Sequence, residues 1–325
     1  MSDYWFYLIA GPIALFVALA IHEAGHLAAG SLVGFRMGMM AVGPIGIVRA
    51  GRRFLLRWLP PSHWGPFAFA YPVTLEGLRP RVAWYVAGGP IASLTTATVL
   101  FVVSRSIAPS AAGRTIGFIA LLSACVFVAT AQPFGTGIGI ASDGARFWSL
   151  MRNTADARLD LAMFTLAGQD YGGVRPREWK PWVLEWAATT QASPAYELVA
   201  ATVGLRRAID VDDARAAQEQ VQRIRAVYAR VPRMLRGDAA AASALWLAQR
   251  GNDLAAARVF LKDTDVALAE SYRRWIAEAA VLSLADAREG ARTALDRAQA
   301  ALSQGMGQPS ALDRELVESM AQALE

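Results

Sequence analysis

Three long apolar segments constrain the fold most strongly, because each is long enough to cross a lipid bilayer, which requires about 20 apolar residues. The first lies within residues 4–35, the second spans residues 82–104, and the third starts after Arg114 and stays uncharged to Ser142. Pro133 and the glycines after it should end the third helix early. With 54% hydrophobic residues, the chain also differs from an ordinary soluble protein. We expect a mainly α-helical, polytopic membrane protein with about three transmembrane helices.

Positive charge is concentrated in the first half of the chain. Residues 1–150 contain ten arginines, no lysine and four acidic residues, a net charge of +6, whereas residues 151–325 have a net charge of −1. Arginines beside apolar segments are typical of membrane–water boundaries, so we interpret this excess as membrane flanks rather than a nucleic-acid surface. We expect no nucleic-acid partner.

The distribution of arginine also predicts an orientation. Arginines cluster between the first and second spans and again after the third, and three spans place these two regions on the same side. The positive-inside rule makes that side the cytoplasm and puts the N-terminus outside. The first 35 residues have no basic leader and no small-residue cleavage site, so we expect a retained helix rather than a cleaved signal peptide. These patterns predict a multi-pass cell-membrane protein with a cytoplasmic C-terminal domain.

The chain divides by composition into a membrane-embedded core, residues 1–150, and a soluble all-α domain, residues 151–325. Within the core, residues 36–81 alternate short apolar stretches with glycine and proline, which favours a small interfacial β region over a fourth span. An edge strand there could pair with an extended peptide, or the region could be a packed interfacial loop. In the second part, helix-turn-helix pairs at residues 239–261 and 273–302 resemble a tetratricopeptide-like array, which would offer a surface to a protein partner.

One motif breaks the apolar character of the first span. His22 and His26 are separated by one helical turn and therefore project from the same face of a helix, where they can bind one zinc ion. Glu23 lies about 100° around the axis from His22, close enough to act as a general base without being a ligand. Ionisable residues at membrane depth are costly and usually functional. This motif predicts a zinc-dependent hydrolytic site with Glu23 as its catalytic residue.

A catalytic zinc ion usually has three protein ligands and one open position. The candidates for the third ligand are His63, Glu76 and Asp143. Asp143 is favoured because it follows the third span in Ser142-Asp143-Gly144, after a glycine-rich break that lets the backbone turn back towards the metal.

The three spans together resemble the site-2 protease family of intramembrane zinc metalloproteases. That family has a His-Glu-x-x-His motif in its first core helix, often a Gly-Pro motif in the second, and an Asp-Gly motif at the end of the third. Here they correspond to His22–His26, to Gly89 and Pro90, and to Asp143 with Gly144. The resemblance covers roughly residues 5–150. It implies that His22, His26 and Asp143 bind one zinc ion.

The sequence differs from the family's motifs at positions that bear on substrate binding. Ser93 stands where the family often has an asparagine after Gly-Pro, and Thr130–Pro133 lacks the asparagine that often precedes the proline of the third motif. The interval from Pro133 to Asp143 is also longer than in the commonest form. Gly89, Pro90 and Ser93 are therefore expected near the substrate, with altered positioning. No PDZ-like insert or nucleotide-binding module is evident in the sequence.

The resemblance implies hydrolysis of peptide bonds in or near transmembrane segments of membrane proteins, with release of a cytosolic fragment. The expected substrate is a single-span protein within the lipid bilayer, whose helix must unwind to expose a carbonyl. A rival enzyme class is the prenyl-protein processing type, which takes its third ligand from a glutamate on a later helix; the later spans contain no glutamate. A non-enzymatic alternative is an idle membrane scaffold that recruits partners through its C-terminal helices.

Overall fold

A computed structural model describes residues 3–61, 64–107, 110–135, 141–189, 193–264 and 270–325. The chain forms two compact units. The first contains residues 1–48 and 56–164, and the second contains residues 49–55 and 165–325. The three long apolar helices and the predicted metal ligands all belong to the first unit.

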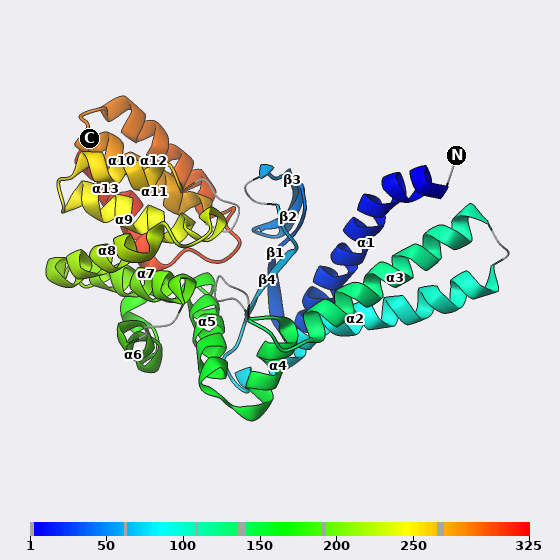
Figure 1. The fold of residues 1–325 in the computed structure, drawn as a ribbon. Helices are drawn as coiled ribbons and strands as arrows, with labels where there is room; N and C mark the ends of the chain where they lie inside the picture. Colours follow the sequence, from blue (N-terminus) through cyan, green and yellow to red (C-terminus); the bar gives the residue numbers. More distant parts are fainter. Residues whose placement is uncertain (1–2, 62–63, 108–109, 136–140, 190–192, 265–269) are drawn as a thin grey trace. The chain divides into compact units, whose positions relative to one another are not determined.

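Three long helices lie side by side in the first unit (Figure 1). They are α1 (Asp3–Leu32), α2 (Leu78–Ser106) and α3 (Ala111–Ala131), and each contains a segment long and apolar enough to cross a membrane. The prediction of three such helices is confirmed, and α3 ends before Pro133 as expected. Large apolar side chains on α2 and α3 face outwards, among them Ile91, Phe101 and Leu121. Such surfaces suit contact with lipid tails.

Small residues let α1 and α2 approach closely. A Cβ atom added to Gly25 would lie 2.5 Å from the Gly88 carbonyl oxygen, and one added to Gly88 would lie 2.4 Å from the Gly25 oxygen. Backbone contact of this kind is the usual basis of tight helix packing in membranes. It brings the His-Glu-x-x-His and Gly-Pro segments together.

A four-stranded sheet lies between α1 and α2 in the sequence. Its strands are β1 (Phe35–Val42), β2 (Ile45–Ala50), β3 (Arg53–Trp58) and β4 (Phe67–Pro72), in the order β3-β2-β1-β4. β1 pairs antiparallel with both β2 and β4. The prediction of a small β region is confirmed. All six residues of the edge strand β3 are exposed.

Two further helices complete the first unit. α4 (Asp143–Arg152) and the first part of α5 (Ala155–Tyr171) pack against α2 through a buried cluster that includes Val82, Val86, Leu150 and Ala157. Arg146 of α4 forms an ion pair with Asp160 of α5, with Nε 3.1 Å from Oδ1.

The second unit is built from helix hairpins. Its described helices are α6 (Pro181–Thr189), α7 (Pro194–Asp210), α8 (Ala214–Tyr228), α9 (Gly237–Gln249), α10 (Leu254–Leu261), α11 (Ser271–Leu284), α12 (Arg288–Leu302) and α13 (Ala311–Leu324), with short 3-10 turns at Pro176–Glu178 and Arg233–Leu235. The hairpins α9–α10 and α11–α12 confirm the two predicted helix pairs, and α7–α8 adds a third. Each turn contains an Asp or Asn residue with positive φ, at Asp212, Asn252 and Asp286, a conformation these residues tolerate better than most.

The second unit also buries a group of charged side chains. Asp170 accepts two hydrogen bonds from Arg273, at 3.0 and 2.7 Å, and a further one from Arg206. Burial raises the pKa of Asp170, but the two arginines outweigh it and lower the pKa to about 2. Asp170 is therefore a carboxylate at neutral pH, and its charge is balanced by cations of the protein itself.

Candidate metal centre

The two histidines of the predicted motif lie together on α1. His22 and His26 are both buried, and their Nε2 atoms are 3.3 Å apart. The spacing of four residues on a helix predicted this shared face. The stretch around the motif is apolar, so the two imidazoles are the polar groups that this face of α1 presents.

The structure brings Asp143 to these histidines from 121 residues away in the sequence. Its Oδ2 atom lies 3.1 Å from His22 Nε2 and 3.4 Å from His26 Nε2. The three donor atoms therefore form a nearly equilateral triangle. A tetrahedral zinc ion with bonds of about 2.0–2.1 Å requires ligand atoms about 3.3–3.4 Å apart. The separations fit a zinc site with three protein ligands.

Asp143 is positioned by the junction between α3 and α4. Ser142 caps α4, with its Oγ accepting a hydrogen bond from the Ala145 amide, and the same hydroxyl donates to the Gln132 carbonyl just after α3. Gly144 leaves room for this junction, because an added Cβ atom would lie 2.0 Å from the Ala131 carbonyl oxygen. The glycine of the Asp-Gly motif is thus required for close backbone approach.

Hydrogen bonds from α2 hold the imidazoles in place. His26 Nδ1 lies 2.9 Å from the Tyr85 carbonyl oxygen, and His22 Nδ1 lies 2.9 Å from Ser93 Oγ. The Gly89 amide also lies 3.3 Å from His26 Nδ1, which would require that nitrogen to accept. The carbonyl contact is shorter and a carbonyl can only accept, so we assign Nδ1 as the donor. His26 Nε2 then carries a lone pair, the arrangement that is usual for ligating histidines.

Gly89 of α2 lies directly against the two histidines. A Cβ atom at this position would lie 2.3 Å from His26 Nε2 and 2.8 Å from His22 Cε1. Any side chain here would therefore displace the two histidines. The structure places Gly89 and Ser93 against the histidines, and Pro90 is buried beside them in α2. A contact of these three residues with substrate stays a prediction.

The three converging atoms could hold a metal ion. Among the described residues, the ion-pair partners of Asp143 are the two histidines alone. A carboxylate and two imidazole lone pairs that converge without a lysine or arginine are a favourable set for a divalent metal.

Glu23 is buried on α1 beside His22. It is not one of the three converging ligands, as the helical geometry predicted. The other two candidates for the third ligand are not in this group: Glu76 is exposed in the turn before α2, and His63 lies outside the described residues.

The sequence did not reveal the backbone contact of His26 with Tyr85, because a carbonyl carries no residue-specific signal. Ser93 was expected near the substrate, and its contact with His22 could have been anticipated from its polarity, since a hydroxyl in an apolar span usually faces a partner inside the bundle. Comparisons were made with protein-family models, curated proteins and solved structures, and none matches the chain.

Proposed function

We propose that this protein is an intramembrane zinc metalloprotease that resembles the site-2 protease family and hydrolyses peptide bonds in or near transmembrane segments. The observation that supports this most is the triangle of His22 Nε2, His26 Nε2 and Asp143 Oδ2, with separations of 3.1–3.4 Å, beside a buried Glu23. Charged groups inside an apolar span are expensive to maintain without a function.

One zinc ion would be held by His22, His26 and Asp143. When bound, zinc supplies Lewis-acid chemistry, which lowers the pKa of water and polarises a peptide carbonyl. The contacts of His26 with Tyr85 and of His22 with Ser93 would fix the imidazole orientation and the tautomer, which is the usual role of partners behind metal ligands.

Glu23 would act as the general base and then as the general acid. Its carboxylate accepts a proton from water as the water oxygen attacks the peptide carbonyl carbon. It then gives that proton to the nitrogen of the departing amine as the C–N bond breaks. Burial keeps bulk water away from this carboxylate, so the proton is shared between Glu23 and the reacting groups.

The substrate class is a single-span membrane protein. Its helix must unwind locally, because helical backbone groups are hydrogen-bonded to one another and are inaccessible to attack. The exposed edge strand β3 offers free backbone groups that could pair with the unwound segment, a recurrent mode of peptide binding. Cleavage would release a cytosolic fragment, with the C-terminal domain of the enzyme in the cytoplasm and its helix hairpins forming a tetratricopeptide-like surface.

The test is a substrate trap. Tagged wild-type protein and the Glu23→Gln variant are expressed in the native host, solubilised in mild detergent, and compared for co-purifying membrane proteins by mass spectrometry. We expect the variant to hold a full-length single-span protein that is found shortened with the wild type. Equal sets of intact partners, together with full biological activity of the variant, would instead indicate the membrane scaffold. The zinc content of both samples is also measured. Equal zinc content would show that Glu23→Gln removes the general base without removing the metal.

A further inference from the structure

The tip of the β2–β3 hairpin belongs to the helical unit, although most of the sheet belongs to the first unit. Residues 49–55, which contain the turn and the start of β3, group with residues 165–325. Residues 56–58 of the same strand group with the three long helices. The strand β3 therefore begins in one unit and ends in the other, so a contact that fixes the tip also bears on β3.

Gly51, in the turn of this hairpin, lies against the loop between α12 and α13, residues 303–310. Its amide donates a hydrogen bond to the Gly305 carbonyl oxygen, at 3.0 Å, and its own carbonyl accepts one from Arg49 Nε, at 2.9 Å. A Cβ atom on Gly51 would lie 2.9 Å from the Ser303 carbonyl oxygen, and the residue has a φ of +59°. The contact is thus made by main chain on both sides, and both its closeness and its conformation favour glycine.

A buried carboxylate holds the 303–310 loop in shape. Glu270, just before α11, accepts a hydrogen bond from the Gly307 amide at Oε1, 2.9 Å, and one from the Met306 amide at Oε2, 3.1 Å. Burial raises the pKa of Glu270 to about 7, so its ionised form is disfavoured by removal from water. Because each oxygen binds a different amide, the side chain fixes the orientation of the loop as well as its position.

The end of α5 provides a second hold on the same loop. The Gln308 amide donates a hydrogen bond to the Tyr171 carbonyl oxygen, at 2.8 Å. A Cβ atom on Gly307 would lie 2.5 Å from that oxygen, and one on Gly305 would lie 2.8 Å from Glu270 Oε2. The two glycines therefore let the loop fit closely against its supports.

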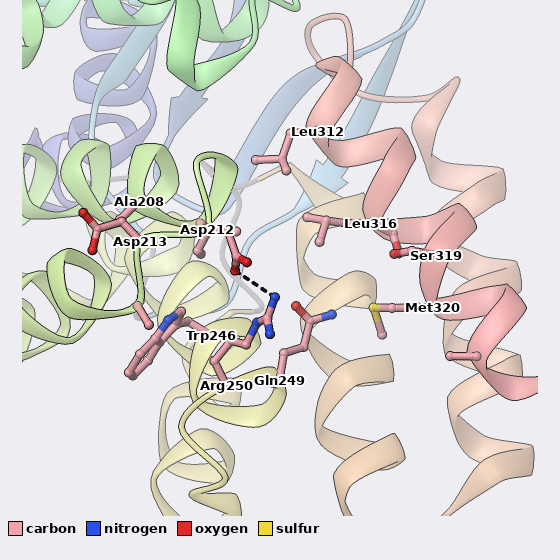
Figure 2. Close-up of a pocket in the computed structure, with 13 residues that line it drawn as sticks. Ala208, Asp212, Asp213, Trp246, Gln249, Arg250, Leu312, Leu316, Ser319 and Met320 are labelled. Carbon is pink, nitrogen blue, oxygen red and sulfur yellow. Dashed lines mark hydrogen bonds and ion pairs between the residues drawn. The ribbon is translucent and has the colours of Figure 1, made fainter.

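The helix that follows this loop is packed less closely. Leu316 and Met320 of α13 border a cavity of about 420 Å³, together with Trp246 and Arg250 of α9 (Figure 2). Well-packed interiors leave few voids larger than a water molecule. The close fit of the 303–310 loop is therefore a local feature, not a property of this whole end of the domain.

We propose that the 303–310 loop is an internal receptor for the Gly51 turn, through which the helical domain holds β3 ready to pair with an unwound substrate segment. Gly51 and Glu270 are then positioning residues, since Gly51 makes the contact and Glu270 shapes the loop that accepts it. An edge strand that is already fixed loses less conformational entropy when a peptide pairs with it. The role in substrate binding rests on the proposed function, but the contact itself does not.

The test compares two substitutions that strain the sheet in the same way. Gly51→Ala and Gly43→Ala each add a methyl group to a turn residue with positive φ, +59° and +52°. At position 51 the methyl carbon would lie 2.9 Å from the Ser303 carbonyl oxygen, whereas at position 43 it would lie 4.0 Å from Phe16, an ordinary contact distance. The control therefore keeps the backbone strain and lacks the clash with the loop.

Hydrogen exchange of the full-length protein in detergent measures the contact independently of catalysis. We expect the amide of residue 51 to exchange at least about tenfold faster in Gly51→Ala than in the wild type or in Gly43→Ala. Glu270→Gln keeps the size of the side chain but turns an NH₂ group towards one of the two amide donors. In this variant the Gly51 amide should also exchange faster, while the amides of α11 stay protected. Equal exchange of residue 51 in all four proteins would overturn the proposal.

The role in substrate binding is tested by cleavage of the single-span protein recovered from the substrate trap. We expect Gly51→Ala to raise KM at least about fivefold and to leave kcat and the zinc content within about twofold of the wild type, because binding alone is weakened. Gly43→Ala should change none of these. An unchanged KM in an active Gly51→Ala enzyme would overturn this role alone. If the wild type cleaves no membrane protein, the proposed function fails and the role in substrate binding fails with it, whereas the exchange result still decides the contact.

Discussion

Two buried clusters of charge in this protein are balanced in different ways. In the helical domain, Asp170 is surrounded by Arg206 and Arg273, so the chain supplies the cations as well as the anion. In the membrane core, Asp143 meets two imidazoles and no lysine or arginine forms an ion pair with it within the described residues. The first cluster is thus a self-balanced ion network, whereas the second could hold a metal ion, as we propose.

The largest expected effect concerns the proposed metal site. Asp143→Asn keeps the shape of the side chain but removes its charge. We expect the zinc content of the purified protein to fall from about one ion per chain to below about a tenth, because the neutral amide of asparagine is a much weaker zinc ligand than a carboxylate. Metal analysis by mass spectrometry measures this. Asp160→Asn is the control, since Asp160 pairs with Arg146 rather than with the histidines; loss of zinc in both variants would contradict the assignment.

The next effect tests the structural network. Asp170→Asn leaves two buried arginines without their shared carboxylate, so we expect the stability of the helical domain to fall by about 3–5 kcal/mol. Hydrogen exchange of α7 and α11 in the full-length protein measures the change. Asp212→Asn is a matched control, because its ion pair with Arg250 is exposed and should contribute less than about 1 kcal/mol. An unchanged exchange rate in Asp170→Asn would show that the network is dispensable.

A third prediction concerns pH. Burial raises the pKa of Glu270 from 4.5 to about 7, although the Met306 and Gly307 amides donate hydrogen bonds to its carboxylate. Since the folded pKa is raised, its contribution to stability is fully present below about pH 4.5 and is lost as the pH rises to about 7. The loss is about 3 kcal/mol at about 1.4 kcal/mol per pKa unit. The lowered pKa of Asp170 acts in a separate window, below its usual value of 3.8.

The Glu270 prediction is checked by unfolding the protein in urea at several values between pH 4.5 and 8. Stability of the helical domain should decrease across this range and then level off above about pH 7. The Glu270→Gln variant has no titrating group at this position, so its profile should lack that decrease. A decrease of the same size in Glu270→Gln would assign the pH dependence to other groups.

The smallest expected effect concerns Gly89, which lies against His22 and His26. In Gly89→Ala, the new methyl group meets His26 Nε2, so we expect zinc affinity to fall by about 10–100-fold, as when partners of metal ligands are altered. Competition with a chelator measures the affinity. Gly117→Ala in α3 is the control, because its Cβ would meet nothing closer than 3.5 Å. Equal affinities would mean that the two helices move apart at little cost.

Local patterns predicted those parts of the molecule that depend on neighbouring residues. The three spans, the early end of α3 and the hairpins α9–α10 and α11–α12 follow from apolar runs, proline and glycine. The pairing of His22 with His26 follows from helical spacing, and Asp143 from its position after a glycine-rich break. The sheet was expected, but its order β3-β2-β1-β4 was not, because several pairings of short strands satisfy the same pattern.

Contacts between distant residues could not be predicted in this way. Ser93 meets His22 only because α1 and α2 pack in one register, which is set by the approach of Gly25 to Gly88. The network of Asp170, Arg206 and Arg273 was missed because charges on helices rich in alanine and arginine resemble solvent-exposed ones. Their burial is decided by tertiary packing.

The hydrogen bond from His26 to the Tyr85 carbonyl ties this site to the main chain of α2. A side-chain partner can be exchanged by one substitution, but a main-chain oxygen is the same whatever residue bears it. In α2 the Gly89 amide is the natural helical donor to that oxygen, and Pro90 leaves the next carbonyl, of Val86, without a donor. The basicity of His26 is thereby connected to the local geometry of α2. In the proposed zinc site, bilayer thickness, which affects how membrane-spanning helices tilt and bend, would then act on the orientation of His26.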